Sequence, residues 1–512
     1  GSFAGYMYVA EHGGHKIRLL TPTSIYTRGG WASDPSSPGA ADYINQNGIN
    51  SRFNAPSGID IDASGNLYVA DYNNHVIRKV SAFTSVGNVQ AISTLAGEAQ
   101  TNSPMGGYVD ATGSNARFLF PTDVAVAADG NIYVADAGNH CIRKITPNGV
   151  VTTLAGNGFE APGFRDGNDT NARFYNPIAI EVLDNNTLLV ADAFNHRIRA
   201  ININTGAVTT YAGSGTRGAL DGSISTSQFR TPSGLAVDAF GSVYVAEGFD
   251  GQANTIRKIS NGQVKTIAGE YQTFGTTDEF ETLARFYRPF HMSFDETGKI
   301  LYVVDQENHS IRKIDFKPII DFSASSTTPV LNQVITLNSQ VKGEASNYTW
   351  TITPSTFAYE SGFNANSANP QISFTATGTY EVKLEVSNDF GSDVETKTAY
   401  ITVGSSGTSP VASFDVDKLS GVPNLTLFSF TDKSTNNPTS WEWTFSPNNV
   451  NFSANSSATS QNPQCTFTAT GIYEVKLKAS SANGNSTSPS KFININPVSV
   501  KEVNFEELFN LY

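Results

Sequence analysis

The sequence predicts an all-β protein of several domains. Charged residues make up only 15% of its 512 residues, where roughly 25% is usual, and 44 Gly, 32 Phe and 20 Tyr indicate turns and aromatic strands. One phrase of strand-and-turn type recurs six times in the first part, and two later segments align with each other. Repeated short strands therefore organise the chain, and long charged helices do not.

The recurring phrase is a strand that ends in an acidic residue and continues into a turn with Asn and His. Its six copies are GYMYVAEHGGHKIR (5–18), GNLYVADYNNHVIRK (65–79), GNIYVADAGNHCIRK (130–144), NTLLVADAFNHRIRA (186–200), GSVYVAEGFDGQANTIRK (241–258) and KILYVVDQENHSIRK (299–313). The acidic residues are 55 to 65 positions apart. This period predicts one supersecondary unit per copy.

Within a copy, four short alternating runs are bounded by Gly, Asn and Asp, for example 121–128, 131–136, 141–146 and 150–156. A four-stranded sheet cannot bury both of its faces alone, so such sheets stack around an axis as the blades of a propeller. We therefore predict a six-bladed β-propeller over residues 1–315. The apolar residues of the first strands, Val124, Val126, Leu235 and Val237, are expected to pack between blades.

These residues carry a family resemblance. The phrase VADxxNHxIRK, with GNxYV before it and TLAG after it, resembles the NHL repeat. Copy one lacks a first strand and copy six lacks a last strand, so we expect the natural sequence to continue upstream of Gly1 by roughly 30 to 45 residues, which would complete the ring.

Two β-sandwiches are predicted after the propeller, over residues 316–404 and 408–497. Tyr380, Val382 and Leu384 alternate with polar residues, as the corresponding residues of the second segment do, and Trp350 and Trp443 are the expected core anchors. The phrases TGTYEVKLEVSN and TGIYEVKLKAS resemble the PKD domain, an immunoglobulin-like module.

The last segment, 498–512, belongs to neither sandwich. Its ending FNLY resembles the lead into the C-terminal sorting domain of type IX secretion. This resemblance implies a secreted or cell-surface protein of a Bacteroidota-type bacterium, with the outer-membrane secretion machinery as a partner and more sequence after Tyr512. No apolar run is long enough for a spanning helix, and a net charge of −13 argues against nucleic acid.

Five histidines occupy one repeat position: His15, His75, His140, His196 and His309. Each follows an acidic residue by four positions, and the fifth copy has a longer turn with Thr255 there. Because the position repeats, we expect a structural hydrogen bond in which the acid holds the imidazole across the turn.

Sites are better sought where the copies differ. Small and polar residues lie two and four positions after the proline of each first strand, and they share one strand face. Among them Asp60, Asp123, Glu181 and His291 are expected to converge on the central channel. They could hold Ca²⁺ or Zn²⁺, as the axial metals of gluconolactonase-like and peptidyl-hydroxyglycine lyase propellers imply. The alternative is a hydrated channel with no ion, and no other cofactor is expected.

Aromatic residues in the long connections are a second candidate site, because rings on loops over a rigid scaffold bind peptides and stack on sugars. The alternative is that each ring packs beneath its own loop. The candidates are Trp31, Tyr43, Tyr108, Phe159, Phe164, Tyr271 and Phe274.

The favoured functional prediction is a non-enzymatic extracellular protein whose propeller face binds a protein or glycan and whose sandwiches act as spacers. The first alternative is a metal-dependent lyase or lactonase acting at Asp123, Glu181 and His291. The second alternative is a structural component of a surface assembly.

Overall fold

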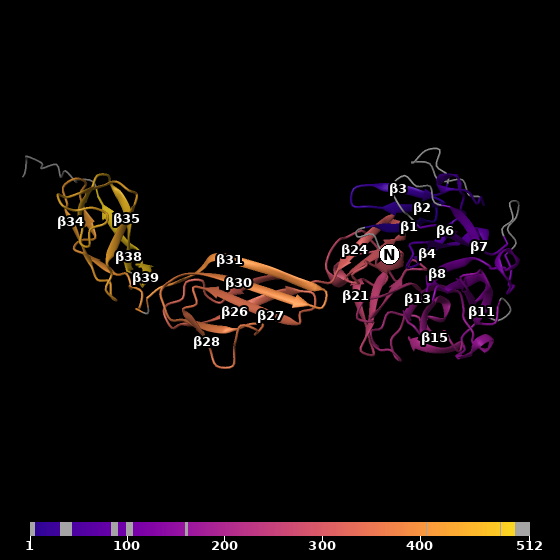
Figure 1. Cartoon of the computed structure of the whole chain (residues 1–512). Coiled ribbons are helices and arrows are strands. Elements are labelled where there is room, and N and C mark those ends of the chain that lie inside the picture. The colour runs from indigo at the N-terminus through magenta and orange to yellow at the C-terminus, as the bar shows by residue number, and fades with distance from the viewer. Residues whose placement is uncertain are drawn as a thin grey trace, which may run out of the picture. The chain divides into compact units, whose positions relative to one another are not determined.

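The computed structural model describes residues 6–30, 43–82, 91–98, 106–158, 162–405, 407–481 and 483–496 (Figure 1). The chain divides into two compact units, Gly1–Phe316 and Lys317–Tyr512. Within the described ranges the regular structure consists of strands and single 3₁₀ turns, and no helix is long and apolar enough to cross a membrane. The predicted all-β class is confirmed.

Each copy of the repeat forms its own antiparallel sheet in the first unit. Sheet 1 contains β1 (Met7–Glu11), β2 (Lys16–Leu20) and β3 (Ile25–Gly29), and sheet 2 contains β4 (Pro56–Ile61), β5 (Leu67–Asp71), β6 (Val76–Val80) and β7 (Ile92–Ala96). Sheet 3 contains β8 (Pro121–Val126), β9 (Ile132–Asp136), β10 (Cys141–Ile145) and β11 (Val151–Ala155). Sheet 4 contains β12 (Gly167–Asn168), β13 (Pro177–Asp184), β14 (Thr187–Asp192), β15 (Arg197–Asn202) and β16 (Ala207–Ala212). Sheet 5 contains β17 (Gly222–Ser223), β18 (Pro232–Val237), β19 (Val243–Glu247), β20 (Thr255–Ser260) and β21 (Gln263–Gly269), and sheet 6 contains β22 (Pro289–Phe294), β23 (Ile300–Asp305) and β24 (Ser310–Asp315).

Short 3₁₀ turns recur at two places in the unit. Four follow the second strand of a sheet: η2 (Tyr72–Asn74), η4 (Ala137–Asn139), η6 (Ala193–Asn195) and η8 (Gln306–Asn308). Four lie in the connections that lead to a first strand: η1 (Gly48–Asn50), η3 (Gly113–Asn115), η5 (Asp169–Asn171) and η7 (Glu281–Leu283).

Neighbouring sheets pack through their first strands, as the sequence predicted. β4 contacts β8, β8 contacts β13, β13 contacts β18 and β18 contacts β22, while β1 takes the place next to β4. Val124 and Leu235 are buried in apolar clusters that two adjacent sheets share, and Val126 and Val237 pack against them. Interdigitation between blades therefore supplies the core that one sheet lacks.

The first and last sheets of this unit have three strands each among the described residues. β1 is half-buried along its whole length, whereas the equivalent β9 is fully buried. Likewise β24 is largely half-exposed, whereas its equivalent β10 is almost fully buried. Burial is thus lower in the two sheets that have three strands among the described residues.

A buried ion pair joins the second and third strands of sheets 2 to 6. In sheet 3, Arg143 Nη1 lies 2.8 Å from Asp136 Oδ2, and both side chains are fully buried. The pairs Asp71–Arg78, Asp192–Arg199, Glu247–Arg257 and Asp305–Arg312 repeat this contact at 2.8–3.0 Å. Because all five hydrogen-bonding groups of the guanidinium are donors, carbonyl and carboxylate oxygens must surround it.

The connection before each sheet supplies those oxygens. Arg143 donates to the backbone oxygens of Arg117 and Val109, both at 2.9 Å, and to Asp110 Oδ1 at 2.5 Å. Asp110 also accepts the backbone N–H of Thr153 on the outer strand at 2.9 Å. Asp166 and Asp221 repeat this role in sheets 4 and 5, and Asn45 replaces the acid in sheet 2. One arginine therefore ties connection and sheet together.

The second unit contains the two predicted sandwiches. The first packs the sheet β25 (Ile319–Ala324), β26 (Val334–Lys342), β29 (Gln371–Phe374), β28 (Phe357–Tyr359) against the sheet β27 (Asn347–Thr353), β30 (Gly378–Asn388), β31 (Gly391–Val403). The second packs β32 (Phe414–Val416), β34 (Phe428–Asp432), β37 (Gln464–Phe467), β36 (Val450–Phe452) against β33 (Ser420–Gly421), β40 (Lys491–Ile495), β38 (Gly471–Ser481), β35 (Ser440–Ser446), with β39 (Gly484–Thr487) on β38. Trp350 and Trp443 are each 3% exposed in the respective cores, as predicted.

Replacing Arg143 by Leu should lower the free energy of unfolding of the first unit by about 3–5 kcal/mol, because Asp136 would be left charged and buried without its partner. Urea denaturation monitored by circular dichroism measures this loss. The matched control is Arg312→Leu in sheet 6, where the arginine is 13% exposed and its outer partner Asp278 is 87% exposed. An equal loss in both variants would contradict the role assigned to burial.

Candidate functional site

Four of the five repeated histidines join neighbouring sheets, and they do not pair with the acid across the turn. His75 Nδ1 accepts the backbone N–H of Phe120 in the next sheet at 3.0 Å, and His140 Nδ1 accepts that of Asn176 at 3.1 Å. His15 and His196 do the same with Ala55 and Thr231. Burial lowers the pKa of these four imidazoles, which favours the neutral form that can accept a hydrogen bond.

The predicted acid–histidine bond is therefore wrong, because the acid is already used. Asp71 accepts from the backbone of Asn54, from Asn74 and from Arg78. The prediction that Thr255 occupies the histidine position in the fifth copy is wrong as well. Thr255 pairs with Glu247 in the ladder, as Cys141 pairs with Asp136, and Asn254 takes the histidine position by accepting the N–H of Arg288 at 3.0 Å.

Two channel carboxylates also join adjacent first strands. Asp60 on β4 accepts the backbone N–H of Val126 on β8 at 2.7 Å, and Asp123 on β8 accepts that of Ile180 on β13 at 3.0 Å. The second oxygen of each accepts the N–H of the following residue, Ile61 or Val124. Gly58 permits this approach, because a Cβ there would lie 2.0 Å from Asp123 Oδ1.

Burial dominates the electrostatics of these residues. It raises the pKa of Asp60 and of Asp123 to about 7, although the backbone N–H groups favour the charged form. Burial raises the pKa of Glu181 well above its usual value, and the charges of Asp60 and Asp123 raise it further. Burial lowers the pKa of His291 to about 4, so this imidazole is neutral near pH 7.

The four residues expected to hold a metal lie near one another but do not assemble as ligands. His291 Nδ1 is 3.9 Å from Asp123 Oδ2, and His291 Nε2 is buried without a hydrogen-bond partner. No group of three or more His, Cys, Asp or Glu side chains in the described part of the chain could hold a metal ion. Each oxygen of Asp60 and Asp123 accepts one backbone N–H, and the four side chains do not form a set of metal ligands as they lie.

The connection aromatics chosen from the sequence are distributed over separate sheets. Tyr43, Tyr108 and Phe164 lie over the buried arginines of sheets 2, 3 and 4, with ring centroids 4.8–5.1 Å from the guanidinium carbons. Tyr271 accepts a hydrogen bond from Arg230 at 3.2 Å, and Phe274, which is 64% exposed, stacks on Tyr287. Trp31 and Phe159 lie outside the described residues.

A second set of aromatic residues, not predicted from the sequence, lies where first strands begin and second strands end. In sheets 1 to 3 the rings of His12, Tyr72 and Phe120 follow one another with centroids 5.8 and 5.0 Å apart. In sheets 4 to 6, Tyr175, Phe194, Phe249 and Phe290 form a second run, with neighbouring centroids 5.0, 5.6 and 6.1 Å apart. We call these seven residues the aromatic arc.

The aromatic arc is accessible and borders the channel. Phe120, Tyr175 and Phe194 are 38–41% exposed, which is unusual for large apolar side chains that contact one another. Phe290 precedes the channel residue His291 and contacts its ring at 5.1 Å. The pKa of His12 is lowered mainly by burial and further by the imidazoles of His15 and His291.

The signal for the aromatic arc was present in the repeat. Its members other than Phe290 lie in the turn after a second strand or just before the proline of a first strand, where other copies have Ala137, Gly138 or Thr231. Phe290 directly follows that proline, on β22.

Three family models match four segments of the chain. Residues 53–79 and 118–145 match the NHL repeat, and residues 319–401 and 408–496 each match a PKD domain. The chain carries NHL repeats followed by two PKD domains. With the stacked sheets described above, the first unit is an NHL β-propeller.

Known proteins resemble this chain over part of its length. NHL repeat-containing protein 2 of Gallus gallus is 29% identical over 296 residues, which cover 51% of this chain and 38% of the relative. A probable peptidyl-alpha-hydroxyglycine alpha-amidating lyase of Caenorhabditis elegans is 28% identical over 151 residues, covering 29% of this chain and 37% of the relative. The solved virginiamycin B lyase of Staphylococcus aureus has 17% identity and a TM-score of 0.36, covering 61% of this chain and 78% of its own. The chain thus spans less than half of these curated relatives.

In the Asp123→Ala variant the free energy of unfolding should fall less steeply with rising pH than in wild type. The pKa of Asp123 is raised in the folded state, so the native protein binds more protons than the unfolded chain between about pH 4 and pH 7. The stabilisation is complete below the unfolded pKa and is lost as the pH rises through the folded pKa of about 7.

From pH 5 to pH 8 the free energy of unfolding of wild type should therefore fall by on the order of 2 kcal/mol more than that of the variant. Denaturant titrations at both values measure the difference. Ala179 holds the equivalent position in sheet 4, so alanine is compatible with the fold, and the exposed Asp129→Ala is the control. A variant with the pH dependence of wild type would refute the raised pKa.

Proposed function

We propose that the propeller is a non-enzymatic binding module that presents the aromatic arc to a protein or glycan outside the cell, with the PKD domains as spacers. The observation that carries the proposal is the pair of runs of contacting aromatic rings, in which Phe120, Tyr175 and Phe194 are exposed. Aromatic rings on a rigid scaffold bind partners at low conformational cost, because the unbound site is already ordered.

The positions of the arc residues support this interpretation. Each ring lies next to a backbone segment that the buried arginine or the inter-sheet histidine holds in place. Phe120, for example, donates its N–H to His75 and also contacts that imidazole at 4.6 Å. The rings are thus held by structural bonds and can contact a ligand without rearrangement of the backbone.

The extracellular location is part of the proposal. PKD domains are typical of extracellular and cell-surface proteins, and the two matched segments cover most of the second unit. Export by the type IX route rests on the FNLY ending and is proposed on that resemblance.

Phe194→Ala combined with Phe249→Ala should weaken ligand binding about tenfold or more, because central aromatic residues dominate such interfaces. The wild-type protein is first screened on glycan and peptide arrays, and the affinity of the best ligand is then measured for each variant by calorimetry. The matched control is Phe240→Ala. Phe240 is 53% exposed in the turn between β18 and β19, at the opposite end of sheet 5.

A ligand that binds wild type and the double variant equally would refute a role for the aromatic arc. A protein that binds nothing on either array would favour the structural role in a surface assembly.

A lyase or lactonase acting in the channel is the second candidate. The observation that favours it is His291, whose buried Nε2 lacks a partner while Nδ1 approaches Asp123. Metal analysis of purified protein distinguishes the candidates. Stoichiometric Ca²⁺ or Zn²⁺ that disappears in His291→Ala would favour the enzyme, whereas equal metal content in wild type and variant would argue against a site at His291.

A further inference from the structure

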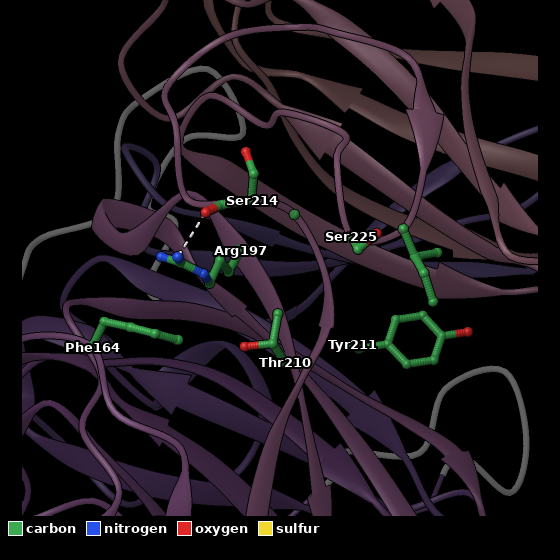
Figure 2. A pocket seen from close by; sticks show the side chains of 8 residues that line it. Phe164, Arg197, Thr210, Tyr211, Ser214 and Ser225 are labelled. Carbon is green, nitrogen blue, oxygen red and sulfur yellow. Dashed lines mark hydrogen bonds between the residues drawn. The ribbon is translucent and has the colours of Figure 1, made fainter.

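A cavity of about 300 Å³ lies beside the outer strand β16, away from the aromatic arc (Figure 2). Its walls come from β15, β16 and the connections on either side, and they include Phe164, Arg197, Tyr211 and Ser225. This volume lies at the lower end of the range for small-molecule sites, roughly 300–1,000 Å³. It could therefore accept a ligand with the size of one sugar ring.

Two of the lining residues distinguish the fourth copy of the repeat from the others. The strand register places Arg197 where other sheets have Lys16, Val76, Cys141, Thr255 and Ser310. Tyr211 occupies the position of Leu95, Leu154 and Ile267. Arg197 and Tyr211 both line this cavity. The fold does not require an arginine or a tyrosine at these positions, because the other copies have different residues there.

The guanidinium of Arg197 is held in place by oxygens that carry no charge. Nη1 donates to the backbone oxygen of Asn195 at 3.1 Å, and Nη2 donates to that of Ser214 at 2.7 Å. The group also lies 3.8 Å from the centroid of Phe164, and Figure 2 shows it above that ring. Gly215 makes room for it, since a Cβ there would lie 2.0 Å from Nη1.

Arg197 has no acidic partner within 4.0 Å in the part of the chain that the structure describes. Each repeated arginine has one, and the nearby Asp166 is already paired with Arg199 at 2.5 Å. Arginine stays charged in proteins, and its remaining N–H donors match the geometry of a carboxylate. The cavity therefore contains a half-buried cation that forms no close ion pair with a described side chain, although Asp192 and Asp166 act on its pKa from farther away.

We propose that this cavity binds a uronic acid unit, which is a sugar that carries a carboxylate. Arg197 binds the carboxylate, and the ring of Tyr211 lies beside the pyranose. Ser225 and Tyr211 also line the cavity and add polar side chains to its wall. The site is separate from the aromatic arc, so the inference goes beyond the proposed function.

The test compares D-glucuronate with D-glucose, which differ only at the carboxylate, by titration of the full chain under calorimetry or ¹H–¹⁵N NMR. Glucuronate should bind about tenfold more tightly than glucose, because a charge-assisted hydrogen bond is stronger than a neutral one. Arg197→Val should abolish that difference. Tyr211→Leu should weaken the binding of both sugars.

The two substitutions introduce residues that equivalent positions already hold, Val76 and Leu154, so the fold is expected to persist; thermal melting checks this. Arg285→Thr in the connection before sheet 6 removes the same charge elsewhere and should leave glucuronate binding unchanged. The double variant Phe194→Ala with Phe249→Ala should also retain it, which separates failure of this site from failure of the aromatic arc.

Three outcomes would overturn the proposal. Equal affinity for the two sugars would exclude recognition of the carboxylate, and full glucuronate binding by Arg197→Val would exclude this arginine. Acetate or an acidic peptide binding more tightly than glucuronate would show that the cavity recognises a carboxylate without the sugar.

Discussion

The propeller depends on the ion pair that a buried arginine forms in each of sheets 2 to 6. Arg143 bonds to Asp136 at the end of the second strand, to backbone oxygens of the incoming connection and to Asp110, which in turn bonds to the outer strand. A charge with so little solvent is stable only if oxygens surround it. The arginine therefore requires the turn, the connection and the outer strand to occupy one arrangement.

Contacts between sheets depend on that arrangement. In sheet 3 the acid that pairs with the arginine, Asp136, also accepts Leu119 N–H, which positions the residues before the first strand of the same sheet. Phe120 then presents its N–H to His75 of the preceding sheet. Within a sheet the ion pair holds the second strand, the third strand and the connection together. Between sheets the neutral imidazole accepts a backbone N–H of the next sheet. Side chains that take no part in these hydrogen bonds can differ between copies, and the aromatic arc and Arg197 occur at such positions.

Much of this organisation could be predicted from the sequence because repetition supplies it. The period and the alternating runs predict a sheet for each copy, and the buried Trp350 and Trp443 are where the pattern predicts them. Partners were less predictable. Four positions separate Asp71 from His75, but the carboxylate turns toward Arg78 and the imidazole toward the next sheet, since buried donors and acceptors pair by direction in space.

The sequence by itself determined the repeat, the positions of its strands and the order of propeller and sandwiches, because local alternation and turn residues encode them. Only the tertiary structure decided what the differing residues do. Asp60 and Asp123 share one channel wall, yet their oxygens are used by backbone N–H groups of the neighbouring strand. Tyr175 and Phe249 are far apart in the chain, yet each contacts Phe194. Such contacts depend on the packing of one sheet on the next. The sequence pattern within a single copy contains no information about which residues of two neighbouring sheets come into contact.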